Sequence, residues 1–428
     1  MGGLGMMLLA LCLSSGYLIF GRPFAYLGVT PFYPAELYLL LAALFLPRRW
    51  LGAMIGDLLA LRPVALLSAL VIAWGVVSVA RGLEAGYDPE IALKEFSAHY
   101  YVLYFFVGRA VSHHFHRRRA ALFFVISGLL AGINCIIYAL YTSRIELFLP
   151  WAPEVPAFDV PAMLSYPLVG LTAFAPYTGV AGVVAIIVDL VASLTNPGRA
   201  LWLSMLLGCG VVFALRPDRR MVVKVVISVL VVVAVVYSVG SLIPAAEGRG
   251  GSLSPMWVVA QVLSTFDPEM AHDLLIESDE GVEASTVYSR FGTINWRYTI
   301  WEFIIDSLDS AELWFLGHGY GLELPSLIIG AENLRSPHNF ILYLLGYTGL
   351  IGLAIYLSFS GALLGAFYRL PRSPYRSFLL GQFASVWTLA MFGNALETPF
   401  VTVPYYLGMG MAYGAAVIEA RSVKKDNA

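Results

Sequence analysis

Apolar runs long enough for membrane helices, about 20 residues each, recur through most of this 428-residue chain. They are continuous rather than alternating, a pattern that favours transmembrane helices over transmembrane β-strands. Inside a bilayer a helix also satisfies its own backbone hydrogen bonds. The composition agrees, because 59% of the residues are apolar and only 13% are charged, against about 25% charged in a soluble protein. The sequence therefore predicts an all-α polytopic membrane protein.

We expect about twelve transmembrane helices. Residues 1–243 should hold nine of them, residues 341–428 should hold three, and the polar insert 244–340 should separate the two groups. Pro176 divides the run 162–195 into two helices, since proline ends or kinks a helix. The predicted crossings are residues 4–20, 33–46, 63–80, 97–112, 119–142, 162–176, 178–195, 199–215, 221–243, 341–368, 377–394 and 402–419.

The distribution of basic residues predicts the orientation of these crossings. Cytoplasmic segments of membrane proteins carry an excess of Lys and Arg. If the crossings alternate with 48–62 inside, 17 of the 26 basic residues are cytoplasmic. A single crossing over 162–195 would instead leave strongly basic loops on both sides. We therefore expect both termini in the cytoplasm, with Arg199, Glu397 and the insert 244–340 on the outer side.

Function is expected in the insert 244–340, which has four arginines and no lysine. Its first part combines an amphipathic stretch, 256–266, with an acidic run, 267–283, whose spacing matches no calcium loop. Arg297 and Trp301 follow, four residues apart and hence on one helix face. A glycine-rich turn at 317–321 precedes Ser336-Pro337-His338-Asn339. Because proline suits the first turn of a helix, we expect His338 in the opening turn of the next helix.

The residue types of the insert suit an anionic substrate. Arginine is always charged, and its planar fork matches phosphate oxygens. Arg290, Arg297 and Arg335, with Arg199, are therefore candidates to bind a diphosphate. His338 is the candidate base, because histidine can accept a proton from a hydroxyl at neutral pH. The three cysteines lie far apart in apolar runs, so no metal site or cofactor is expected. The net charge of −2 indicates no affinity for nucleic acid.

Three segments resemble motifs of the bacterial O-antigen ligase and Wzy-type polymerase superfamily. The stretch 193–200 resembles its Thr-x-Ser-Arg-Gly-Ala element, although Pro197-Gly198 precede the arginine here. Arg297 and Trp301, followed by the turn 317–321, resemble its Arg-x-x-x-Trp and Gly-x-Gly-x-Gly elements. The segment 337–352 resembles its His-Asn and Glu-x-Gly-x-x-Gly helix, with Tyr347 and Thr348 where the family often has an acid. The likeness covers about residues 160–370.

The resemblance implies a GT-C-like membrane fold and transfer of a glycan from an undecaprenyl-diphosphate carrier to an acceptor sugar hydroxyl. Arg199 and Arg297 would hold the diphosphate, and His338 would orient or deprotonate the acceptor. Asn339 would orient His338, and Trp301 would complete the substrate site. The reaction would invert the anomeric configuration and need no metal. It would take place at the periplasmic face of the bacterial inner membrane, among membrane lipids.

The acceptor and the class of activity have alternatives. An O-antigen ligase would use lipid A–core as the acceptor, whereas a polymerase would extend a growing O-antigen or exopolysaccharide chain. A flippase or transporter for lipid-linked glycans is the alternative from another class. It would carry charged residues within its spans, and Asp189 is the clear candidate for such a residue.

Overall fold

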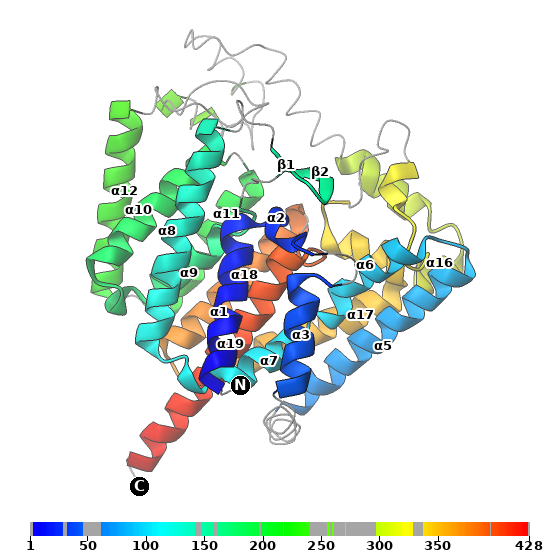
Figure 1. The fold of residues 1–428 in the computed structure, drawn as a ribbon, viewed down its shortest axis with the longest axis horizontal. Helices are drawn as coiled ribbons and strands as arrows, with labels where there is room; N and C mark the ends of the chain where they lie inside the picture. The colour runs from blue at the N-terminus through cyan, green and yellow to red at the C-terminus, as the bar shows by residue number, and fades with distance from the viewer. Residues whose placement is uncertain are drawn as a thin grey trace. The chain divides into compact units, whose positions relative to one another are not determined.

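The computed structural model of the chain is drawn in Figure 1. It describes residues 3–28, 32–45, 61–141, 147–156, 161–196, 198–216, 218–239, 255–256, 259–260, 270, 297–327, 337–393 and 395–426. The elements in these residues are helices, apart from one antiparallel hairpin of β1 (Phe148–Leu149) and β2 (Ala152–Pro156). Apart from Met270, the predicted acidic run 267–283 lies outside the described residues, as does most of the amphipathic stretch 256–266.

Six helices in the described part of the chain are long and apolar enough to cross a membrane. They are α1 (Gly3–Phe20), α5 (Arg62–Glu84), α8 (Arg117–Tyr141), α12 (Arg219–Val239), α17 (Phe340–Tyr368) and α19 (Pro399–Asp426). Three shorter apolar helices accompany them: α3 (Pro34–Phe45), α10 (Gly179–Thr195) and α11 (Arg199–Leu215). The chain is thus a polytopic helical membrane protein, as the apolar runs predicted. The count of twelve crossings and the orientation stay predictions.

The region around Pro176 has two helices. Helix α9 (Ser165–Ala173) ends before a 3₁₀ turn, η2 (Ala175–Tyr177), and α10 begins at Gly179. The expectation of one helix over 97–112 is wrong, because the structure has α6 (Pro89–Tyr100) and α7 (Leu103–Val111) with a turn between them. The hydroxyl of Tyr101, within this turn, donates to Glu36 of α3, and the hydroxyl of Tyr104 in α7 donates to the carbonyl of Ala35. Such side-chain contacts are invisible in a hydropathy pattern.

Residues 1–14, 35–115 and 296–428 form one compact unit. Its centre is α19, which packs against α7 and against α18 (Pro374–Phe392). A Cβ added to Gly108 of α7 would meet the carbonyl of Leu407, so the missing side chain lets the two backbones approach closely. Helix α17 packs against α5, α18 and the short helix α16 (Ala311–Leu316). This unit contains His338, Arg297 and Trp301.

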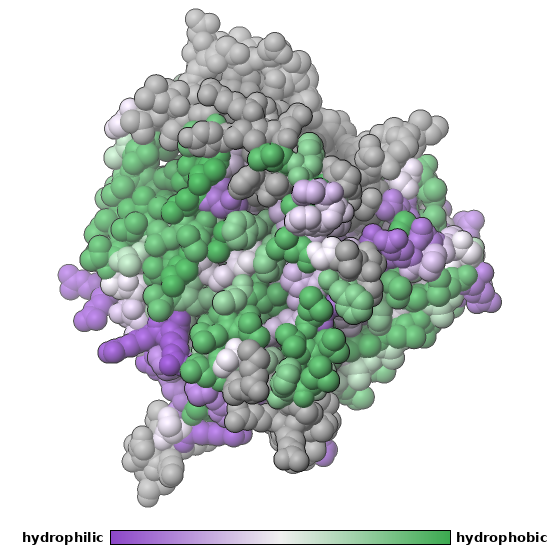
Figure 2. Space-filling view, in the orientation of Figure 1, coloured by the Kyte–Doolittle hydropathy of each residue, from purple (hydrophilic) through white to green (hydrophobic). Residues whose placement is uncertain are grey.

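Residues 15–34 and 116–295 form the second unit, which contains Arg199. Helix α10 packs against α8 and α12, and α11 packs against α9. The outward surface of α12 is apolar, with exposed Val226, Leu230 and Val233. Figure 2 shows hydrophobic surface over this helix and, in the first unit, over α5. Apolar side chains exposed along whole helices suit contact with lipid.

Candidate active site

His338 has an unusual backbone conformation directly before α17. Its φ is 53°, the one positive φ of a non-glycine residue in the described part of the chain. Left-handed backbone costs a non-glycine residue about 1–3 kcal/mol, and it persists only where the surroundings impose it. Such strain is concentrated at functional sites. The backbone of His338 therefore marks this segment as a candidate active site.

Helix α17 begins at Phe340, with Asn339 as its N-cap. The side-chain Oδ1 of Asn339 accepts hydrogen bonds from the N–H groups of Ile341 at 3.0 Å and Leu342 at 3.2 Å. Asparagine is among the best N-cap residues because it satisfies these end donors. The expectation that His338 lies in the opening turn is thus wrong. The proline pattern predicts a helix start at Pro337, but the buried Asn339 is the N-cap, so the helix begins at Phe340, two residues after His338.

A helix over residues 297–306 lies beside this segment. Its Trp301 donates a hydrogen bond from Nε1 to the carbonyl oxygen of Pro337 at 2.9 Å. Ile300 and Ile304 are buried, and Ile304 contacts Gly346 of α17. The helix therefore has an apolar face that fixes it on α17 and a neighbouring face, bearing Arg297 and Trp301, that meets the Pro337-His338 segment.

Arg297 influences the protonation of His338. Burial, and then the positive charge of Arg297, lower the pKa of His338 to about 4. Burial also lowers the pKa of Arg297 itself, but an arginine this basic stays charged at neutral pH. At pH 7 the site thus combines a fixed cation with a neutral imidazole. This pairing can bind an anion and accept a proton from a hydroxyl.

The glycine turn 317–321 is a junction between helices. Gly317, Gly319 and Gly321 have φ values of 71°, 85° and 103°, which only glycine adopts easily. A Cβ on Gly319 would lie 2.6 Å from the backbone nitrogen of Gly82 on α5. The turn therefore needs glycine both for its conformation and for its contact with α5.

This turn meets a break in α17 at Gly349, whose φ of 65° and ψ of −173° are not helical. Such a break leaves carbonyls of the preceding turn without their intrahelical donors. The N–H groups of His318 and Gly319 donate to the carbonyls of Gly346 and Tyr347, at 2.9 and 3.0 Å. Trp74 Nε1 donates to the carbonyl of Thr348 at 2.9 Å. The turn thus stabilises irregular backbone within a membrane helix.

The N–H groups of the turn are already in use, which separates it from a phosphate-binding glycine loop. Besides the two N–H groups that contact α17, the N–H of Gly317 donates to the carbonyl of Leu313, and the N–H of Tyr320 donates to the carbonyl of Ser78. The N–H of Gly321 donates to Glu95 Oε2 at 2.8 Å. Phosphate loops require backbone N–H groups that point at the ligand. The N–H groups of this turn therefore do not point at a phosphate, and the arginine side chains stay the candidates for anion binding.

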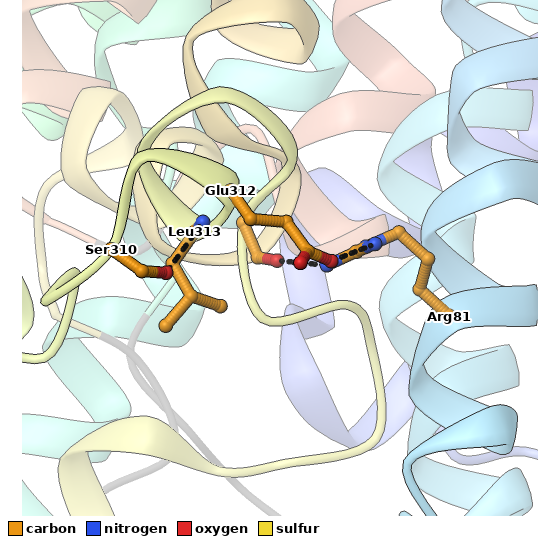
Figure 3. A network of polar contacts seen from close by, with 5 residues as sticks. Arg81, Ser310, Glu312 and Leu313 are labelled. Atoms are coloured by element: carbon orange, nitrogen blue, oxygen red, sulfur yellow. Dashed lines mark hydrogen bonds and ion pairs between the residues drawn. The ribbon is translucent and has the colours of Figure 1, made fainter.

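Arg81 of α5 joins the start of the turn to α16, as Figure 3 shows. Its Nη1 is 3.0 Å from Glu312 Oε1, and its Nη2 donates to the carbonyl of Gly317 at 3.2 Å. Ser310 caps α16 by accepting the N–H of Leu313 at 3.3 Å. His318 lies close by, and its Nε2 is 3.1 Å from Ser307 Oγ. Arg81 and His318 are therefore engaged in packing the turn.

A buried polar chain behind the turn was missed by the sequence analysis. His99 Nδ1 is 2.8 Å from the carbonyl of Val71, and its Nε2 is 2.6 Å from the hydroxyl of Tyr320. Glu95 contacts Gly321 and Tyr347, and burial raises the pKa of its carboxyl to about 8. One signal was available, since Glu95 and His99 stand four apart at the edge of an apolar run.

The structure brings four of the seven predicted site residues into one place: His338, Arg297, Trp301 and Asn339. Arg199 is half-buried at the first position of α11, in the second unit. Arg290 and Arg335 lie outside the described residues. Among the residues that the structure describes, no group of three or more His, Cys, Asp or Glu side chains could hold a metal ion.

Comparison with known proteins finds a family model that covers this segment of the chain. The family model described as O-antigen ligase matches residues 181–357, a range that includes most of α10, then α11 and α12, the helix 297–306, the turn 317–321 and His338. A search of curated proteins finds no match. Members of this family are membrane enzymes of the ligase or polymerase type that act on lipid-linked glycans. Residues 181–357 of this chain are therefore similar to the O-antigen ligase family.

Proposed function

We propose that this chain transfers a glycan from an undecaprenyl-diphosphate carrier to an acceptor sugar hydroxyl at the periplasmic face of the bacterial inner membrane. The observation that carries the proposal is the charged Arg297 beside a neutral, backbone-strained His338, within the range that the family model matches. A cation suits the diphosphate of the donor. A neutral imidazole suits the hydroxyl of the acceptor.

In the proposed reaction His338 accepts the proton of the acceptor hydroxyl. The oxygen of that hydroxyl forms a bond to the anomeric carbon from the face opposite the diphosphate. The bond between the anomeric carbon and the diphosphate oxygen breaks, and undecaprenyl diphosphate leaves with the electron pair. This displacement inverts the anomeric configuration. Arg297, with Arg199, Arg290 and Arg335 as further candidates, stabilises the negative charge that grows on the leaving diphosphate.

Donor binding would also activate the base. In the free protein the charge of Arg297 disfavours protonation of His338. A bound diphosphate offsets that charge, so the pKa of His338 should rise when the donor is in place. The imidazole would then become a stronger base only in the complex that can react. Because the arginines supply the positive charge at the diphosphate, we propose that the reaction is independent of metal.

We propose O-antigen ligase activity, with lipid A–core as the acceptor, as the first candidate. The matched family description supports it. Polymerase activity uses the same donor chemistry and differs in the acceptor, which would be a growing glycan chain.

The test is transfer by the purified protein in nanodiscs. Undecaprenyl-diphosphate glycan is supplied with lipid A–core or with a carrier-linked repeat unit, in the presence and absence of EDTA. Ligase activity predicts glycan on lipid A–core, inverted linkages and no effect of EDTA. Product from the repeat unit alone would identify a polymerase. Loss of activity in EDTA would contradict the metal-free reaction. Movement of donor between leaflets without transfer would support a transporter and refute the proposal.

A further inference from the structure

The strained backbone of His338 is held from both sides. Its φ is defined by four atoms, the first of which is the carbonyl carbon of Pro337. Trp301 Nε1 binds the oxygen of that same carbonyl at 2.9 Å. On the other side, Asn339 Oδ1 accepts hydrogen bonds from the N–H groups of Ile341 and Leu342 at the start of α17. Rotation of His338 toward an ordinary φ would move the Pro337 carbonyl away from Trp301 or Asn339 away from its cap.

Trp301 is suited to this contact by its chemistry and by its place. The indole N–H is a donor with no acceptor function, and it meets a carbonyl on a proline, which itself has no N–H. Tyr298 packs edge-on against the Trp301 ring at 5.6 Å between centroids. Trp301 also shares a face of the helix 297–306 with Arg297. One helix therefore carries both the donor that contacts the carbonyl before His338 and the charge beside His338.

We propose that Trp301 is a positioning residue for His338: its hydrogen bond to Pro337 holds the His338 backbone at positive φ and so directs the imidazole toward the acceptor hydroxyl. This inference rests on the proposed role of His338 as the base. It assigns Trp301 a role through the protein backbone, rather than the direct substrate contact that the sequence motif suggested. A stacking platform for sugar is the competing role, and it predicts different kinetics.

The test compares Trp301→Phe with Trp74→Phe. Both replacements keep an aromatic ring and remove one indole-to-carbonyl hydrogen bond of 2.9 Å in the same unit. Misplacing a reacting group by about 1 Å can cost on the order of 100-fold in rate. Trp301→Phe should therefore lower kcat about 10- to 100-fold and leave KM for the acceptor nearly unchanged. The acid limb of the pH–rate profile of Trp301→Phe should shift, because the surroundings of the His338 imidazole change.

Trp74→Phe should lower the melting temperature and keep the wild-type kcat and acid limb. A rise in acceptor KM in Trp301→Phe, with kcat unchanged, would overturn the positioning role in favour of sugar binding. A second measurement tests the inference even if Trp74→Phe fails to fold. In the His338→Gln background, Trp301→Phe should cause no further loss of residual transfer, since it acts through His338. An additive loss would overturn the inference.

The proposed base, His338, and the proposed positioning residue, Trp301, are refuted by different results. Full transfer by His338→Ala would remove the base, and with it both proposals about this site. If His338→Ala is inactive while Trp301→Phe keeps wild-type kcat and acid limb, only the positioning role of Trp301 is refuted.

Discussion

Replacing Arg297 by glutamine should raise the pKa of His338 by a bounded amount. The pKa is lowered from 6.5 to about 4, first by burial and then by the charge of Arg297. Arg297→Gln removes the smaller cause and leaves the burial. The pKa in the variant should therefore lie above about 4 and below the midpoint of this range, about 5.2. In the wild type only about one imidazole in a thousand is protonated at pH 7.

The assay is a pH titration by NMR of protein labelled with ¹³C at histidine Cε1, in nanodiscs. The chain has seven histidines, so His338→Gln identifies the resonance of His338. Arg81→Gln is the matched control, because burial and, more weakly, the charge of Arg81 lower the pKa of His318. That variant should shift the titration of His318 and leave His338 unchanged. A His338 pKa near 6.5 in the wild type, or an identical pKa in Arg297→Gln, would refute the reasoning.

Three further predictions concern the frame of the site. Gly319→Ala should lower the melting temperature more than Gly86→Ala. Both glycines have a positive φ, but only at Gly319 would the added Cβ have backbone atoms within 3.0 Å. Equal losses of melting temperature would contradict the contact of Gly319 with α5. Asn339→Ala should destabilise the protein by about 1 kcal/mol through the lost helix cap, measured by denaturation, and unchanged stability would contradict that cap. Folding raises the pKa of the Glu95 carboxyl from 4.5 to about 8. Between these two pH values the folded protein keeps this proton and the unfolded chain loses it, so the free energy of unfolding falls as the pH rises from about 4.5 to about 8. Glu95→Gln should remove this fall in melting temperature, and an unchanged pH dependence would contradict the burial of the carboxyl.

Hydropathy predicted the membrane helices because each long apolar run carries its own evidence. It failed at residues 97–112, where the break at Tyr101 and Val102 depends on partners on α3. Those partners are more than 60 residues away in the chain. The helix start at Phe340 was misjudged for a different reason. Both Pro337 and Asn339 are start signals, and only the structure shows that Asn339 makes the capping bonds.

The sequence predicted which residue types form the candidate site, but only part of how they are arranged. The insert singled out Arg297, Trp301 and His338, and the structure places them together. The bond from Trp301 to Pro337 and the positive φ of His338 could not be predicted, since they arise from the packing of 297–306 on α17. The glycine pattern marked a turn, but its partners Ser78, Gly346 and Tyr347 come from distant helices. Convergence of Arg199 with His338 stays a prediction.

The most direct test of the central claim is single-turnover transfer from undecaprenyl-diphosphate glycan by wild type, His338→Ala and His318→Ala in nanodiscs. His338 is proposed to accept the proton, whereas His318 contacts Ser307 within the packed turn. General base catalysis contributes about 10²–10⁴-fold. The account predicts a loss of this size in His338→Ala with donor binding retained, and near wild-type transfer in folded His318→Ala. Wild-type transfer by His338→Ala would contradict it.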